Sequence, residues 1–115
     1  MASSELDILV GEQLSAVSFV QDYVEFHFDG PVLRALRNPL VQTPHGRWQF
    51  PWPGSRDALC EPIGRDVLSV RFETGARIQL ELEGGYQLTI PLDLASYRGP
   101  EAAHFIANGQ FGVVE

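Results

Sequence analysis

Cysteine and long apolar runs are scarce in this chain, and each shortage excludes a class of protein. Cys60 is the only cysteine among 115 residues, so the chain can form no internal disulfide and no metal site with several cysteines. No apolar run reaches the roughly 20 residues that a membrane-spanning helix needs. Residues 1–7 include Glu5 and Asp7 and lack the basic start of a signal peptide. We therefore expect a cytoplasmic protein without a membrane segment.

Sequence motifs of nucleotide-binding, hydrolytic and metal-dependent enzymes are missing as well. Gly84 and Gly85 separate two expected strands and do not open a helix, as a phosphate-binding loop requires. No Gly-x-Ser-x-Gly sequence is present. The three histidines, His27, His45 and His104, are not spaced like zinc ligands. We expect neither a metal nor another cofactor.

The charge of the chain is strongly negative and unevenly distributed. The formal net charge of −7 disfavours nucleic acid and anionic membranes as partners. Residues 30–56 nevertheless contain no acidic residue and four arginines. Acidic side chains elsewhere fall on expected outer strand faces, where they either solvate the sheet or attract a basic partner.

A strand–turn–strand pattern occurs twice in this chain. Length and composition indicate that residues 1–115 form one domain. Gly11, Val17 and Phe19 of the first copy correspond to Gly64, Val70 and Phe72 of the second. Such repetition favours two similar halves, about residues 11–38 and 64–94. We expect a mainly β fold with two repeated three-stranded antiparallel meanders. These would form a sandwich or a partly open barrel, with one or two short helices.

Alternation of apolar and polar residues predicts which side chains face the core of this fold. A three-residue loop at residues 83–85 sets Leu82 opposite Tyr86 and Leu80 opposite Leu88, so that the apolar faces of the two strands coincide. The residues expected to point inward are Val24, Phe26, Phe28, Ile78, Leu80 and Leu82.

The third strand of the first half, at residues 32–37, has two open registers. In the first register, Arg34 lies on the core side, at a margin of the sheet. In the second, the preceding turn is longer, and Leu33 and Ala35 face inward instead.

Two short helices are expected outside the meanders. Within the irregular, proline-rich connection of residues 39–63, Ser55 is expected to cap the first helix. Residues 99–115 are expected to hold the second helix and a last strand. Proline and glutamate at residues 100–101 suit a first helical turn, and Asn108 would follow the end of that helix.

The loop of residues 47–53 and the residues just after it supply the candidate binding site. Tryptophan and arginine often anchor interfaces, and prolines reduce the entropy that is lost on docking. The alternative is a lid, in which the aromatic side chains close one end of the β core. The candidate binding residues are Arg47, Trp48, Phe50, Trp52, Arg56 and Asp57.

Enzymatic chemistry has weaker candidates, and we assign no catalytic residue. Cys60 would need a histidine and an acid brought beside it by the fold, and a lone cysteine next to Leu59 is more often a small buried residue. His104 lies between Ala103 and Phe105, where it is either a packed residue or one rim of a small pocket.

Three segments of the chain resemble a family of small bacterial proteins of unknown function. They are residues 54–60, residues 90–93 and residues 99–103. The resemblance spans most of the chain and implies a small stand-alone bacterial domain, without an activity or catalytic residues.

The leading hypothesis for function is a binding or interaction protein that acts on a protein partner or as a homodimer. An immunity protein that neutralises a toxin is one such role, by analogy of size and charge. One alternative is a small-molecule carrier, whose ligand would sit in a pocket under the Trp48–Trp52 loop. The other alternative is an enzyme that uses Cys60 or His104.

Overall fold

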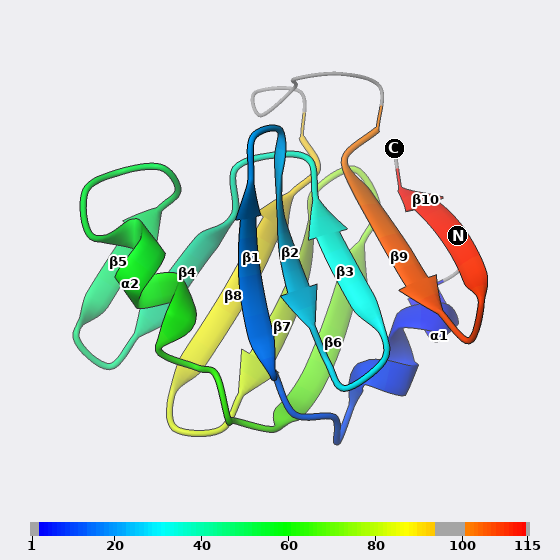
Figure 1. Cartoon of the computed structure of the whole chain (residues 1–115), viewed down its shortest axis with the longest axis horizontal. Coiled ribbons are helices and arrows are strands. Elements are labelled where there is room, and N and C mark those ends of the chain that lie inside the picture. Colours follow the sequence, from blue (N-terminus) through cyan, green and yellow to red (C-terminus); the bar gives the residue numbers. More distant parts are fainter. Residues whose placement is uncertain (1–2, 94–100, 115) are drawn as a thin grey trace.

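Ten β-strands form two antiparallel sheets of five strands each in this computed structural model, which describes residues 3–93 and 101–114 (Figure 1). The first sheet has the order β1 (Ala16–Val20), β2 (Tyr23–His27), β3 (Val32–Ala35), β9 (Ala103–Ala107) and β10 (Gln110–Val114). The second has the order β5 (Gly46–Gln49), β4 (Leu40–Thr43), β8 (Tyr86–Pro91), β7 (Arg77–Leu82) and β6 (Val67–Glu73). The prediction of a mainly β fold is confirmed, and the described strands form no closed barrel.

Short helices flank the sheets. Helix α1 (Ser3–Leu6) and the 3-10 turn η1 (Asp7–Leu9) lie against β6, while helix α2 (Ser55–Cys60) contacts β1, β4 and β5. In Figure 1, α2 stands beside β1 at one side of the molecule, and α1 lies near β9 and β10 at the other. No helix in residues 3–93 and 101–114 is long and apolar enough to cross a membrane.

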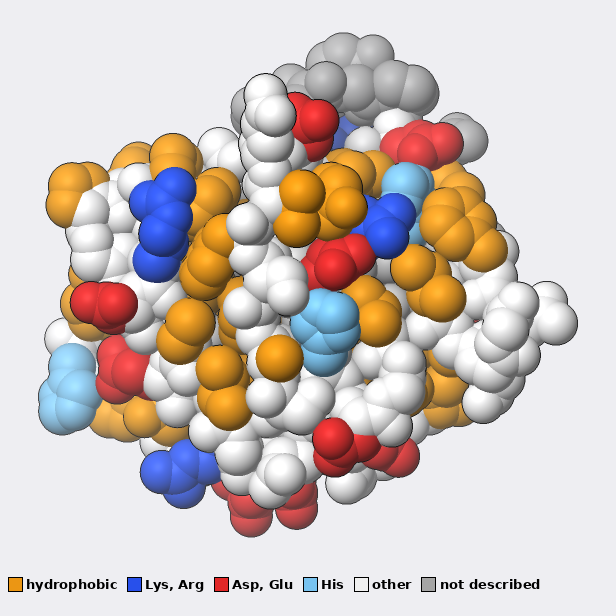
Figure 2. Space-filling view, in the orientation of Figure 1, with side chains coloured by type: hydrophobic (Ala, Val, Ile, Leu, Met, Phe, Trp, Pro, Cys, Tyr) orange, Lys and Arg blue, Asp and Glu red, His pale blue; other side chains and the backbone are white. Residues whose placement is uncertain are grey.

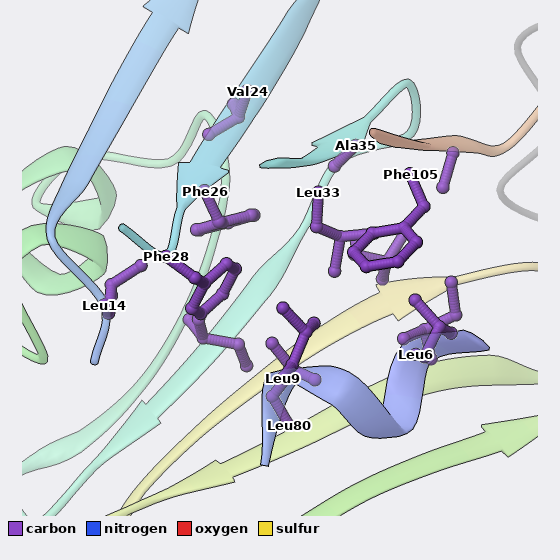
Figure 3. Packing of buried hydrophobic residues seen from close by; sticks show 14 of the residues in the cluster. Leu6, Leu9, Leu14, Val24, Phe26, Phe28, Leu33, Ala35, Leu80 and Phe105 are labelled. Atoms are coloured by element: carbon purple, nitrogen blue, oxygen red, sulfur yellow. The ribbon is translucent and has the colours of Figure 1, made fainter. Parts of the chain in front are cut away.

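One hydrophobic core lies between the two sheets. Side chains from both sheets and from the N-terminal turns meet there, as Figure 3 shows for Phe26, Leu33, Leu80 and Leu9. All six residues that the alternation placed inward are at most 1% exposed. Burial of these apolar side chains is the main stabilising contribution to the fold.

The strand registers match the predicted pairing of the second half and decide the open question in the first. Leu82 lies opposite Tyr86 and Leu80 opposite Leu88, so the three-residue loop is confirmed. Leu33 and Ala35 are buried in β3. Hence the second register is the one present, and Arg34 points away from the core.

The C-terminal helix prediction is wrong, because residues 103–107 form strand β9. Ala103, Phe105 and Ala107 are buried in strict alternation with half-buried neighbours, which is the period of a strand. The pairing of β9 with both β3 and β10 outweighs the local helical preference. Asn108 and Gly109, with φ of 52° and 74°, form the two-residue turn of a β-hairpin. Residues 99 and 100 lie outside the described residues.

The connection of residues 39–63 is also more regular than expected, since it contains β4, β5 and α2. The N-cap of α2 is Gly54 and not Ser55, which is the first helical residue, with its hydroxyl buried. Gly54 has a φ of +85°, and a Cβ there would come within 3.1 Å of Trp48 Nε1. A cap with a side chain is therefore disfavoured at this position. The internal repeat stays a prediction.

Candidate functional site

The outward faces of the two sheets differ in composition. The second sheet presents a mostly polar face, as expected for an antiparallel sheet with one wet side. The first sheet presents many apolar side chains instead. The outward residues of the first sheet are Ala16, Ser18, Val20, Tyr23, Glu25, His27, Val32, Arg34, His104, Ile106, Phe111 and Val113. We call these residues the outer face.

A polar network crosses the middle of the outer face. Arg34 Nε donates to Glu25 Oε2 at 2.9 Å, and Arg34 NH1 donates to His104 Nδ1 at 3.2 Å. His104 Nε2 lies 2.5 Å from Glu101 Oε2, and the guanidinium of Arg34 stacks over the Tyr23 ring at 4.6 Å. These contacts hold the arginine on three sides.

Strand register brings these residues together. Glu25 lies opposite Arg34 in the β2–β3 pair, and Arg34 lies opposite His104 in the β3–β9 pair. Cross-strand neighbours on one face have Cβ atoms about 5 Å apart, which suits ion pairs and hydrogen bonds. The sequence prediction missed this network, because it left Arg34 in an open register and placed His104 on a helix. No local signal links residues 25, 34 and 104.

The partners of His104 determine which of its ring nitrogens accepts a hydrogen bond. Its side chain is only 13% exposed, and those of Glu25 and Arg34 are 15% and 23% exposed. A guanidinium can only donate, so Nδ1 of His104 accepts and carries no proton. The proton is then on Nε2, which donates to Glu101. Both ring nitrogens are thus engaged, which leaves neither available as a general base.

His27 does not complete a catalytic triad with its neighbours. Ser18 Oγ lies 3.2 Å and Glu25 Oε1 lies 3.5 Å from the same nitrogen, Nε2 of His27. A nucleophilic triad needs the acid on one ring nitrogen and the hydroxyl on the other. Among the described residues, no group of three or more histidine, cysteine, aspartate or glutamate side chains is arranged to hold a metal ion.

Apolar side chains surround the polar network (Figure 2). Phe111 is 58% exposed and Val20 is 42% exposed, at opposite edges of the sheet. The Phe111 ring packs against the His104 ring, with 4.7 Å between their centroids. Exposed apolar side chains gathered on one sheet face are unusual for a solvated antiparallel sheet and mark an interaction surface.

Some residues of the Trp48–Trp52 loop have the environment predicted for a lid, and others have the environment predicted for a binding loop. Trp48 and Phe50 pack partly against the core, as a lid would, and the Phe50 ring stacks on Phe19 at 5.8 Å. Trp52 is 58% exposed, as a binding loop would require. Arg56 holds its guanidinium 4.9 Å from the centre of the Phe50 ring. The choice between lid and interface stays open.

The other candidate binding residues do not join this loop in one site. Arg47 is exposed and lines a cavity of about 390 Å³ over the second sheet, and Asp57 is exposed on α2. A cavity of about 310 Å³ beside the loop is lined by Phe50, Pro51 and Arg56. Neither tryptophan lines it. Its size is at the lower limit for a small-molecule site, and the carrier hypothesis stays a prediction.

Cys60, at the end of α2, has a thiol that is poorly activated. Burial raises the pKa of this thiol above its ordinary value, and the negative charge of Asp57 raises it further. The thiolate is the reactive form of cysteine, so a raised pKa lowers the reactive fraction at neutral pH. This environment is the opposite of the one that activates a nucleophilic cysteine.

We expect Cys60 to be alkylated by iodoacetamide at pH 7.5 more slowly than free glutathione, as measured by mass spectrometry over time. D57N should increase the rate, because it removes the neighbouring negative charge, and unfolding in urea should increase it further by removing the burial. A native rate equal to or above that of glutathione would contradict this account and would favour a reactive cysteine.

Comparison of the chain with family models, with curated proteins and with solved structures finds no match. The functional argument therefore depends on the site itself.

Proposed function

We propose that this protein is a non-enzymatic binding protein that docks a protein partner on the outer face. The observation that carries the proposal is the apolar surround of the Glu25–Arg34–His104 network. Interfaces are enriched in aromatic side chains and arginine, which contribute most of the binding energy, and the outer face presents Phe111, Tyr23 and Arg34. A network whose hydrogen bonds are already made within the chain can be covered by a partner without leaving a buried charge unpaired.

The charge of the face supports a basic partner. Arg34 is the only arginine among the outward residues, and its charge is balanced by Glu25. Glu101, at the margin, is a second acidic residue beside this face, in contact with His104. With a net charge of −7 on the whole chain, association with a positively charged surface is fast and sensitive to salt. An immunity-like role is one instance of such binding, by analogy only.

Capture of partners from an extract of the source organism tests the proposal with two matched variants. I106R places a cation in the apolar surround of the outer face. Q79R makes the same substitution on the outward side of β7, in the second sheet. We expect the wild type and Q79R to retain the same protein of high isoelectric point. I106R should weaken the binding of that protein at least tenfold, and added salt should weaken it for all three chains.

Two results contradict the proposal. One is retention of the same proteins by I106R and Q79R with equal affinity, which would place the binding elsewhere. The other is the absence of any protein that the wild type retains in a salt-dependent way. Circular dichroism of both variants confirms that they are folded before capture.

A further inference from the structure

We propose that two copies of this chain associate through the free edges of their β10 strands, so that the two first sheets form one continuous sheet. Strand β10 is the end strand of its sheet and pairs only with β9 among the described strands. In Figure 1 it lies at the outer limit of the molecule. An unpaired strand edge offers backbone N–H and C=O groups to another strand.

The other three sheet edges are protected. Strand β6 carries Arg71 and Glu73, has a bulge between Val67 and Ser69, and contacts α1 and η1. Strand β5 carries the exposed Arg47, and α2 contacts both β5 and β1. Charges, bulges and covering elements are the usual means by which an edge is prevented from pairing. Within the described residues, β10 has no charge and no bulge in its pairing with β9. Strand β1 also has neither a charge nor a bulge, and it differs from β10 in its contact with α2.

The backbone of β10 presents a regular edge. Gln110 pairs with Ala107 across the two-residue turn, which makes them a hydrogen-bonded pair. Because hydrogen bonding alternates along an antiparallel strand, Gly112 and Val114 also bond toward β9. The N–H and C=O groups of Phe111 and Val113 therefore point away from the sheet, toward a second strand.

The sequence of this edge is self-complementary. In an antiparallel pair centred on Gly112, Phe111 of each copy lies opposite Val113 of the other. The backbone N–H and C=O groups of Phe111 in one copy then face those of Val113 in the other. A two-fold axis relates the two pairs, as an isologous dimer requires. The side chains of each pair also lie on the same face, where an aromatic ring beside a β-branched side chain is favourable.

The side chains of β10 do not repel a second copy by charge. Each copy carries a net charge of −7, so most surfaces of two copies repel one another. Residues 110–114 carry no charge, and Glu5 is the only charged residue that lines the adjoining cavity of about 550 Å³. Pairing would place the two exposed Phe111 side chains diagonally across the seam on one face and would join the two outer faces.

Sedimentation velocity of the full chain over a range of concentrations tests this inference. We expect the wild type to approach twice its mass of 12.8 kDa as concentration rises. F111K should raise the dissociation constant of the dimer at least tenfold, because it brings two like charges to the seam. V113P should do the same by removing an outward N–H group that β9 does not use. The control L68K alters an exposed leucine of β6 and should leave dimerisation unchanged.

Amide hydrogen exchange identifies the interface in the same samples. The amides of Phe111 and Val113 should be protected at concentrations where the dimer is present and should exchange rapidly after dilution. A wild type that stays monomeric at every concentration overturns the inference, and β10 would then be free for a strand of another protein. A dimer that survives both substitutions, or that leaves these two amides unprotected, overturns it as well.

Discussion

Replacing Phe26 with alanine should lower the free energy of unfolding by about 3–5 kcal/mol. Phe26 is 1% exposed and lies among the core side chains between the two sheets (Figure 3). Truncation removes most of a phenyl ring and leaves a cavity that the surrounding strands can fill only in part. Because a domain of this size is stable by about 5–15 kcal/mol, F26A is expected to be markedly destabilised.

Urea denaturation followed by circular dichroism measures this effect. The control is L68A, since Leu68 is 55% exposed on β6, and it should change stability by no more than about 0.5 kcal/mol. A loss below about 1 kcal/mol for F26A, or equal losses for both variants, would mean that Phe26 is not enclosed by the two sheets. The packing of the two sheets around a shared hydrophobic core would then be wrong.

Replacing Arg34 with methionine should cost about 1.5–3 kcal/mol, which is the range for hydrogen bonds to charged groups. The substitution keeps a long side chain over Tyr23 and removes the donors to Glu25 and His104. Glu25, which is only 15% exposed, then lies in a largely buried position without its arginine partner. The matched control is R71M, because Arg71 is 70% exposed in its pair with Glu73, and such exposed pairs contribute about 0–1 kcal/mol.

A double-mutant cycle separates the ion pair from simple loss of packing. E25L combined with R34M removes both charges, and two apolar side chains then lie where the ion pair was. We expect the double variant to recover about 1 kcal/mol or more of the loss caused by R34M alone, because no unpaired charge remains. Equal losses in R34M and R71M, or strictly additive losses in the cycle, would show that the network contributes no coupling to stability.

Alternation along the strands could be predicted because it depends on local sequence. Leu80 and Leu82 point inward for the same reason that Glu81 points outward: side chains alternate across a strand. The same reasoning left β3 undecided, since Arg34 and Leu33 compete for the core face and a turn one residue longer reverses the choice. Only the pairing of β3 with both β2 and β9 selects Leu33 and Ala35.

The prediction of a helix near residues 99–106 was wrong for a related reason. Proline and glutamate before an alanine-rich stretch satisfy the local preferences of a helix start, yet Ala103, Phe105 and Ala107 are buried by neighbours that are distant in sequence. Tertiary pairing of this kind regularly overrides weak local preferences. The error also concealed the candidate site, because His104 reaches Arg34 only when residues 103–107 form a strand.

What the sequence by itself determined is the class of the fold, the inward residues of its regular strands and the exclusion of disulfides and multi-cysteine metal sites. Those properties follow from the composition of the chain and from the alternation of apolar and polar residues with a period of two. Only the tertiary structure decided that Glu25, Arg34 and His104 meet on one face and that β10 ends its sheet, with β9 as its one partner among the described strands. Both depend on which strands become adjacent, and adjacency is set by the burial of the whole core and not by any single segment.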